Sequence, residues 1–296
     1  MTQTLSSPCL VCRPALPLDT ADVLEFTKFI WDGHDYVPLV WKNWLADPKG
    51  ILAVAEYGGR VVGLGKVTLL APGQWWMEGL RVDPKVQNLK IGSHIHDYVN
   101  QWWLEHGDGA VRLMTSSQRV KVQHLCERRG FRKIAELSLF AAPALAEPTD
   151  DFQPVPAEDI RAAVEFAHDS PSLAPTGGLM DLGWRFVTLD ETSLAETVSK
   201  DRAWWWRGRQ GLLTTWEDEN PEGEKALMIG LLACGRTSIP AFLMGFRRLA
   251  ARLSYPWAVW IAPLLPEAGQ TLERAGYKND WEYSGYLYEK RHPGRP

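Results

Sequence analysis

Cysteine is scarce in this sequence, with four residues in a chain of 296. Cys9 and Cys12 form a C-x-x-C motif, but the sequence has no second pair that would complete a zinc site. On a strand the two thiols would point to opposite faces, because side chains alternate. Cys126 and Cys234 stand alone. We therefore expect reduced, unpaired thiols and no metal site.

Long apolar runs are missing as well. The longest candidate, residues 226–233, is much shorter than the roughly 20 residues that a membrane-spanning helix needs. Its length is typical of a buried strand. The N-terminal residues do not form a basic region followed by an apolar block, so no secretory signal is indicated. We expect a cytoplasmic protein without a membrane partner.

The chain also lacks an excess of positive charge. Its formal net charge is -4, and it contains no long run of Lys and Arg. Binding to duplex nucleic acid needs clustered positive charge, so we expect no nucleic-acid partner. A small phosphorylated ligand needs only a local anion site, and the net charge does not exclude one. With 45% hydrophobic and 23% charged residues, the composition is ordinary for a globular protein.

The length is about twice that of an average domain, which favours two domains. From residue 10 to residue 141 the pattern predicts a strand, two helices, three strands, a helix, a strand, a helix and a strand. This order is typical of a mixed α/β fold. Gly58-Gly59 predicts a hairpin between the second and third strands. Residues 143–156, rich in Pro, Ala and acidic residues, are the predicted linker between domains 1–142 and 157–296.

An internal repeat relates the two halves at a spacing of 146 residues. Cys126–Phe131 aligns with Leu272–Tyr277, and the identity continues at Glu136 with Glu282. The predicted amphipathic helix 93–106 falls on residues 239–252, which are again amphipathic. We therefore expect the second half to be a diverged copy of the fold of the first.

The segment with the most chemical information follows the third of the three consecutive strands. That strand ends in Val82-Asp83-Pro84, and a tight loop, residues 87–92, leads into a helix. Such a turn directs several backbone N–H groups and the positive end of the helix dipole at one point. This predicts an anion site suited to a pyrophosphate. An ordinary strand-to-helix turn is the alternative.

This segment resembles motif A of the GCN5-related N-acetyltransferase (GNAT) superfamily, V-x-P-x-x-Q/R-x-x-G-x-G/A. Val82, Pro84, Gln87 and Gly92 match it. Cys126–Phe131 is similar to the helix-terminating Y-x-x-x-G-F of that family. Residues 32–38, 44–45 and 78–82 also resemble the histidine N-acetyltransferase-like branch.

The resemblance implies an acyl-CoA N-acyltransferase fold in two tandem copies, with acetyl-CoA as the cofactor. The residues that it implies for the cofactor site are Leu80, Arg81, Val82, Gln87, Asn88, Leu89, Lys90, Ile91, Gly92 and Ser93. One departure is Lys90, which stands where the family has a glycine. If the backbone there is left-handed, a residue with a Cβ pays an energetic penalty.

Glu78 and Cys126 are the candidate catalytic residues. The acceptor amine must lose a proton before it attacks, and by resemblance Glu78 takes that proton. Glu78 lies four residues before Val82, which predicts that both point to the same face of the strand. The alternative is a strand glutamate paired with a basic neighbour such as Arg81. Cys126 stands where the family often has a tyrosine that protonates the leaving thiolate, and inert helix packing is its alternative.

The loop between the first two helices walls the acceptor pocket in this superfamily. Here it carries Asp32, His34, Asp35 and Tyr36, which predicts a small cationic amine such as an amino acid or a polyamine. A solvated polar turn explains these residues equally well.

The second half is expected not to bind coenzyme A, because residues 235–240 lack the spaced Gln and Gly of the first loop. Trp204-Trp205-Trp206, flanked by arginines, suits either a core position or the stacking of a flat ligand. The predicted function is transfer of acetyl from acetyl-CoA to a small-molecule amine, with a homodimer as a candidate assembly. A non-catalytic acyl-CoA-binding or regulatory protein is the main alternative, favoured by Lys90 and Cys126. Acetylation of a protein N-terminus or lysine is a third.

Overall fold

The computed structural model describes residues 9–86, 89–219, 223–265 and 268–295. Contacts divide the chain into two compact units, of which unit 1 comprises residues 1–113 and 290–296 and unit 2 comprises residues 114–289. The chain enters unit 2 within strand β5 (Ala110–Ser116) and leaves it within strand β15 (Gly285–Arg291). The predicted domains, residues 1–142 and 157–296, follow the sequence repeat rather than these contacts, and they stay a prediction.

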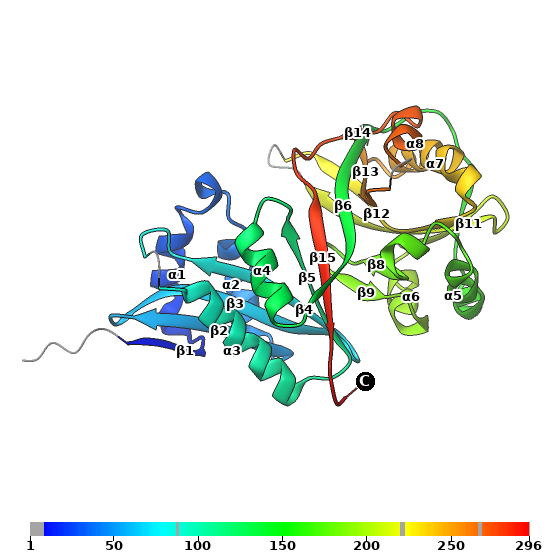
Figure 1. The fold of residues 1–296 in the computed structure, drawn as a ribbon. Helices are drawn as coiled ribbons and strands as arrows, with labels where there is room; N and C mark the ends of the chain where they lie inside the picture. The colour runs from blue at the N-terminus through cyan, green and yellow to red at the C-terminus, as the bar shows by residue number, and fades with distance from the viewer. Residues whose placement is uncertain (1–8, 87–88, 220–222, 266–267, 296) are drawn as a thin grey trace, which may run out of the picture. The chain divides into compact units, whose positions relative to one another are not determined.

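Unit 1 is built on strands that neighbour one another in the order β1-β2-β3-β4-β5 (Figure 1). Before β5 its elements are β1 (Leu10–Pro14), η1 (Pro17–Asp19), α1 (Thr20–Thr27), η2 (Trp31–Gly33), α2 (Val37–Ala46), β2 (Gly50–Tyr57), β3 (Arg60–Ala71), β4 (Gln74–Val82) and α3 (Ile91–His106). Strands β1 to β4 pair antiparallel, whereas β5 runs parallel to β4. Gly58 and Gly59 have φ values of 62° and 78°, which confirms the predicted hairpin between β2 and β3.

Helices α1 and α2 cover one face of these strands, and α3 covers the other (Figure 1). The buried cluster on the α1/α2 face comprises Val23, Phe26, Val37, Trp41, Trp44, Leu52, Val54, Val61 and Leu64. On β3, Gly63 and Gly65 alternate with Leu64 and therefore face α3. A Cβ at Gly63 or Gly65 would lie 2.7 or 2.8 Å from the side chain of Ile95. These two glycines let α3 lie directly on β3.

In unit 2 the strands neighbour one another in the order β15-β6-β13-β12-β11-β10-β7. Besides β15, they are β6 (Arg132–Pro143), β7 (Phe152–Pro154), β10 (Ala203–Trp206), β11 (Gly211–Glu219), β12 (Lys225–Cys234) and β13 (Trp257–Pro263). The hairpin β8 (Leu179–Asp181) and β9 (Phe186–Thr188) is separate, and β14 (Lys278–Asn279) pairs with β6. The helices are α4 (Val120–Arg128), η3 (Ala157–Asp159), α5 (Ile160–His168), η4 (Ala174–Thr176), α6 (Glu191–Val198), η5 (Arg236–Ser238), α7 (Ile239–Arg252) and α8 (Ala268–Arg274).

The predicted repeat is present in the arrangement of the elements. In the first copy α3 connects the parallel neighbours β4 and β5, and in the second α7 connects the parallel neighbours β12 and β13. Helix α7 has the bounds that the repeat predicts. Strand β7 lies inside the segment predicted as a linker, since Phe152 is buried and pairs with Trp206. The mixed α/β fold in two copies is therefore confirmed.

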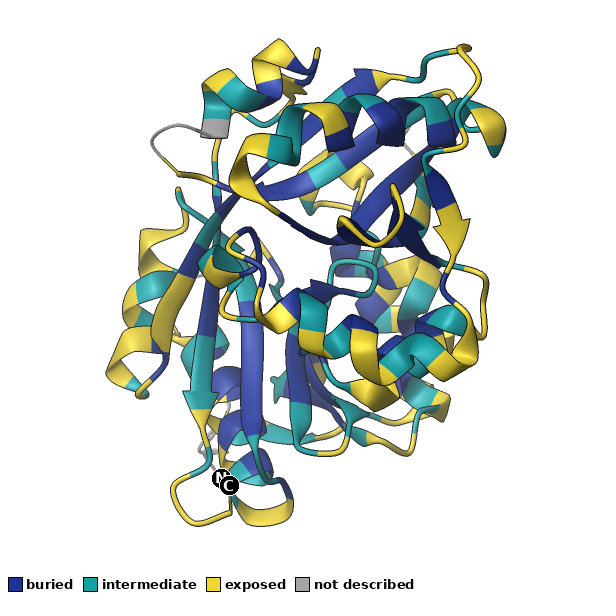
Figure 2. Cartoon of the chain, turned by 90° about the vertical axis from the view of Figure 1, so that its right-hand side faces the viewer, coloured by how far each residue is buried: buried dark blue, intermediate teal, exposed yellow. Residues whose placement is uncertain are grey.

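Burial separates the strands from the outer faces of the helices, as Figure 2 shows. Trp204, Trp205 and Trp206 on β10 are all buried. Trp206 contacts Phe242 of α7 with ring centroids 5.0 Å apart. These tryptophans are core residues, and the alternative of an exposed stacking platform for a ligand is wrong.

The described residues contain no helix that is long and apolar enough to cross a membrane. In the same part of the chain, no group of three His, Cys, Asp or Glu side chains is arranged to hold a metal ion. All four cysteines are free thiols, and Cys126 and Cys234 are buried.

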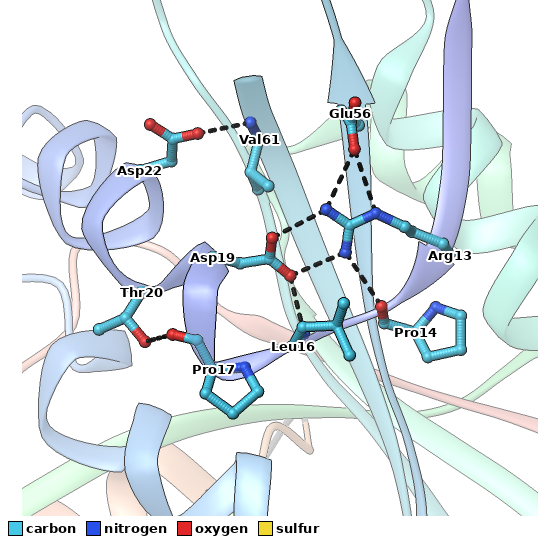
Figure 3. Close-up of polar contacts among 9 residues, drawn as sticks. All are labelled: Arg13, Pro14, Leu16, Pro17, Asp19, Thr20, Asp22, Glu56 and Val61. Atoms are coloured by element: carbon cyan, nitrogen blue, oxygen red, sulfur yellow. Dashed lines mark hydrogen bonds and ion pairs between the residues drawn. The ribbon is translucent and has the colours of Figure 1, made fainter. Parts of the chain in front are cut away.

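A polar network attaches β1 to the start of α1, as Figure 3 shows. The Arg13 guanidinium donates to both oxygens of Asp19 at 2.8 Å and to Glu56 Oε2 at 3.1 Å. Asp19 also accepts the Leu16 backbone N–H at 2.7 Å. Burial raises the pKa of Asp19, but the bonds from Arg13 and Leu16 outweigh burial, and the pKa lies below its ordinary value.

Replacing Asp19 with asparagine is expected to lower the free energy of unfolding at pH 7 by about 1.5–3 kcal/mol, the range for hydrogen bonds to charged groups. The folded-state pKa of Asp19 is depressed, so its contribution is present above the unfolded value of about 3.9 and is lost as pH falls through the folded value. Urea denaturation at pH 7 and pH 3 checks this. If the free energies of unfolding of wild type and Asp19→Asn differed as much at pH 3 as at pH 7, this prediction would be contradicted.

Candidate active site

Strand β4 contains a β-bulge immediately after Glu78. Glu78 pairs with Lys66 and Arg81 pairs with Leu64, so Gly79 and Leu80 together oppose Gly65. Gly79 has a φ of 70°, and a Cβ there would lie 2.6 Å from Cη2 of Trp44. Both the backbone conformation and the space therefore require glycine at this position.

The bulge changes which side chains of β4 share a face. Glu78 and Arg81 pair with residues that are two apart on β3, so both point to the α1/α2 face. Val82 pairs with Gly63, whose face is covered by α3. The prediction that Glu78 and Val82 share a face is wrong, because strict alternation fails where a strand carries an extra residue.

Pairing between β4 and β5 ends before the bulge. The two strands pair from Gln74 with Ala110 to Trp76 with Arg112. Strand β4 continues to Val82, and over that stretch the described residues show no further pair with β5. The backbone edge of β4 from Met77 to Val82 is therefore not part of a ladder on that side. An extended ligand can hydrogen-bond to such an edge.

The loop after β4 ends at the N-terminus of α3. Its predicted residues Gln87 and Asn88 lie outside the described part of the chain, whereas Leu89 and Lys90 are exposed. Lys90 has φ 54° and ψ 25° and is the N-cap of α3. This left-handed conformation costs a residue with a Cβ about 1–2 kcal/mol. The penalty considered at Lys90 is therefore present in the structure.

The first turn of α3 carries no acidic residue, and no side chain caps it. Ser93 N and His94 N donate to the Lys90 carbonyl at 2.9 and 3.1 Å, which leaves the first N–H groups, those of Ile91 and Gly92, for other acceptors. Among the described residues, a Cβ built at Gly92 would meet only Cγ2 of Val82, at an ordinary 3.5 Å. Contacts within this part of the chain therefore do not require glycine at position 92. A ligand that approaches the backbone there would require it.

The predicted acceptor residues divide into two pairs. Asp32 and His34 are exposed, whereas Asp35 is buried and Tyr36 half-buried. The Arg81 guanidinium holds the Asp35 carboxylate through contacts of 3.0 and 3.2 Å. Arg81 thus forms its ion pair with Asp35, and the role of Glu78 stays a prediction.

Tyr36 lies close to Glu78 and to the bulge. Burial raises the pKa of the Tyr36 hydroxyl to about 12, the Arg81 cation opposes this, and the charges of Glu78 and Asp35 add to it. A backbone hydrogen bond with Gly79 also acts on this hydroxyl. Tyr36 therefore stays protonated at neutral pH and can donate a hydrogen bond beside Glu78.

Sequence reasoning missed a buried ion pair next to Glu78. The Lys66 side chain is 1% exposed, and its Nζ lies 2.8 Å from Oδ2 of Asp47 at the end of α2. Burial raises the pKa of Asp47, but the bonds from Lys66 and the Lys49 N–H hold it below its ordinary value. A lysine inside the apolar run of β3 is the signal that could have revealed this pair, since a buried charge needs a partner.

Cys126 belongs to unit 2, where it is fully buried on α4. Burial, together with the charge of Glu127, raises the pKa of its thiol to about 12. The thiol therefore stays protonated at neutral pH. Its role as a proton donor stays a prediction.

The second copy repeats the bulge but covers the edge of its strand. On β12, Gly230 is the extra residue between the pairs that Thr214 and Thr215 make, and pairing with β13 ends at Ile229. Ser172 Oγ then donates to the Leu232 carbonyl at 3.0 Å and accepts the Cys234 N–H at 2.9 Å. Ser170 Oγ donates to the Cys234 carbonyl at 3.0 Å. These hydroxyls occupy the edge of β12 that corresponds to the edge of β4 outside the ladder with β5.

The fold defined by these elements is the GNAT fold. The chain is similar over its whole length to a GCN5-related N-acetyltransferase from Sphaerobacter thermophilus, with a TM-score of 0.64, 15% identity and 98% of each chain covered. It is also similar to a tandem GNAT protein from the clavulanic acid biosynthesis pathway, with a TM-score of 0.58 and 12% identity. That likeness covers 97% of this chain and 100% of the other.

The family follows from the sequence of the first half. Residues 19–131 match the model of the acetyltransferase (GNAT) family. The chain therefore contains an acetyltransferase domain of the GNAT family, and the resemblance found in its motifs is confirmed.

Two curated relatives belong to the N-acetyltransferases. Probable N-acetyltransferase 16 from Homo sapiens is 26% identical over 202 residues, covering 62% of this chain and 55% of that protein. Histidine N-acetyltransferase from Oreochromis niloticus is 29% identical over 86 residues, covering 29% of this chain and 26% of that protein. The chain thus spans about half of the length of one relative and a quarter of the other.

Proposed function

We propose that the GNAT domain transfers the acetyl group of acetyl-CoA to the primary amine of a small molecule. The amine attacks the thioester carbon directly, a C–N bond forms, the C–S bond breaks, and the thiolate leaves with the electron pair. An amino acid is the favoured acceptor, since the relative from Oreochromis niloticus is named a histidine N-acetyltransferase. A polyamine-like amine is the other candidate.

Two parts of unit 1 bind the cofactor in this proposal. The N-terminus of α3 holds the pyrophosphate through backbone N–H groups and the helix dipole. The unpaired edge of β4 at Leu80–Val82 hydrogen-bonds the pantetheine and polarises the thioester carbonyl. Arg81 belongs to this edge through its backbone, and the remaining predicted cofactor residues are Gln87, Asn88, Leu89, Lys90, Ile91, Gly92 and Ser93.

Glu78 is the proposed general base. An alkylammonium has a pKa near 10, so the acceptor must lose a proton before it attacks. Glu78 lies next to the bulge and near the Tyr36 hydroxyl, on the same face as Arg81. Tyr36, with Asp32 and His34 on the exposed part of the loop, borders the acceptor. Asp35 contributes through Arg81, because its carboxylate is already paired.

Gly92 is the observation that carries the proposal. Among the described residues a Cβ there would meet only Cγ2 of Val82, at an ordinary distance, so the space above this helix turn suits the close approach of an anion. Gly235 offers a matched position before α7 in the second copy, since a Cβ there would meet only Ser238 Oγ at 3.8 Å.

Calorimetric titration is expected to show one acetyl-CoA per chain, because Ser170 and Ser172 already occupy the edge of β12. Gly92→Ala is expected to weaken binding about tenfold or more and to keep or slightly raise stability, since alanine favours a helix by roughly 0.5–1 kcal/mol. Gly235→Ala is expected to bind like wild type. Two sites per chain, or unchanged affinity in Gly92→Ala, would contradict this.

A non-catalytic acyl-CoA-binding protein is the second candidate, favoured by the complete burial of Cys126. It predicts binding of acetyl-CoA without release of thiol in the presence of amino acids or polyamines. A thiol-release assay over such a panel separates the two candidates.

A further inference from the structure

The acceptor loop combines its own turn hydrogen bonds with an unfavourable backbone conformation. Three consecutive residues, Trp31, Asp32 and Gly33, have φ values of 48°, 53° and 89°. The left-handed region is unfavourable for tryptophan and aspartate, so this conformation persists only when surrounding contacts fix it.

Arg81 supplies such contacts from β4. Its guanidinium carbon lies 4.1 Å from the centre of the Trp31 ring and 5.1 Å from that of Tyr36. Its Nε lies 3.0 Å from Asp35 Oδ2, and the Asp35 side chain has no exposed area. One planar group thus holds both ends of the loop by charge and by stacking.

The same guanidinium also fixes the bulge. Arg81 Nη1 donates to the Leu80 carbonyl at 3.2 Å, and Leu80 is one of the two bulge residues. On the other side of the bulge, Gly79 is enclosed by Trp44. The orientation of the peptide groups from Gly79 to Val82 therefore depends on Arg81.

We propose that Arg81 is a positioning residue that couples the conformation of residues 31–36 to the bulge geometry of β4. This inference rests on the proposed function, in which the β4 edge polarises the thioester. A displacement of these amides weakens catalysis without removing the pyrophosphate site, because the Arg81 guanidinium is held by the acceptor loop and the bulge, whereas the pyrophosphate site is at the N-terminus of α3.

Arg81→Met tests the coupling, with Arg13→Met as the matched control. Arg13 also pairs with a buried aspartate in unit 1, but it contacts neither the loop nor the bulge. Arg81→Met is expected to lower kcat by about 30-fold or more. Complete loss of an oxyanion donor costs about 10²–10³-fold, and displaced amides are expected to cost somewhat less or the same. The KM for acetyl-CoA is expected to stay within about threefold. Arg13→Met is expected to lower Tm while kcat stays near that of wild type.

Amide hydrogen exchange without ligand gives an independent measurement. In Arg81→Met, residues 31–36 and 79–82 are expected to exchange at least about tenfold faster, with no change in α3. If Arg81→Met does not fold, Asp35→Asn replaces it, with the same direction expected in kcat and in exchange.

Two outcomes would overturn the proposal. One is unchanged kcat together with a loss of Tm like that of Arg13→Met. The other is a raised KM for acetyl-CoA at constant kcat, which would make Arg81 a direct cofactor ligand. If wild type shows neither binding nor turnover, the proposed function fails, and the exchange measurement alone decides: faster exchange in both segments supports the coupling, and its absence overturns it.

Discussion

Glu78→Gln is expected to lower kcat/KM by about 10²–10⁴-fold, the range for loss of a general base. The affinity for acetyl-CoA is expected to stay the same, because the pyrophosphate and pantetheine contacts come from backbone groups. Glutamine keeps the size of the side chain but cannot take the ammonium proton of the acceptor. A thiol-release assay with the preferred amine, beside calorimetric titration of acetyl-CoA, measures both quantities.

The pH dependence distinguishes this role from simple disturbance of the strand. In wild type, kcat/KM should fall on the acidic side as the base and the acceptor amine become protonated. In Glu78→Gln, the part of this fall that comes from protonation of the base should be absent. Glu56→Gln is a suitable control, since Glu56 is a strand glutamate of unit 1 that binds Arg13. If Glu78→Gln kept more than about a third of the wild-type kcat/KM, Glu78 would not be the base.

Asp181→Asn is expected to stabilise the protein at pH 8 by more than about 1 kcal/mol. Asp181 ends β8 and is 3% exposed. Burial raises its pKa to about 8, the N–H groups of Trp184, Arg185 and Gly183 oppose burial, and Asp218 adds to it. Asparagine has nearly the same volume, keeps an oxygen that can face these N–H groups, and carries no charge.

The sign follows from the proton balance. Between pH 4 and pH 8 the folded chain keeps a proton on Asp181 that the unfolded chain, with a pKa of about 3.9, has released. Wild-type stability therefore falls as pH rises through this interval, by at most about 1.4 kcal/mol per pH unit from this group. Asp181→Asn removes that slope.

Urea denaturation at pH 5 and pH 8 measures the difference. Asp190→Asn is the control, because it removes a carboxylate whose charge is useful in the folded state. The Asp190 carboxylate caps α6 by accepting the Ser193 N–H at 2.7 Å. That change is expected to be neutral or destabilising at both pH values. If the stability advantage of Asp181→Asn were equal at pH 5 and pH 8, the raised pKa would not be its cause.

The proposed cofactor side of the site could be predicted from the sequence because its determinants are local. A strand, a glycine and a helix N-terminus follow one another from Val82 to Gly92, and the backbone itself supplies the donors. The same holds for the repeat, since the hydrophobic spacing of residues 239–252 already fixes which face of α7 is buried.

The acceptor side depends on tertiary structure. The bulge at Gly79 reverses the face on which Glu78 lies relative to Val82, and alternation along a single strand gives no sign of it. Arg81 with Asp35, and Lys66 with Asp47, are ion pairs between elements far apart in the chain. Each such pair depends on how a helix packs on the sheet, which local spacing does not encode.

By itself, therefore, the sequence determined the class of fold and its duplication and predicted the place of the pyrophosphate loop, because short-range periodicity and backbone chemistry specify them. Tertiary structure alone decided which charges neutralise one another around Glu78, and which strands belong to each compact unit. The physical reason is that ion pairing, burial and strand pairing are set by neighbours in space, and these come from β3, β4 and the helices packed on them.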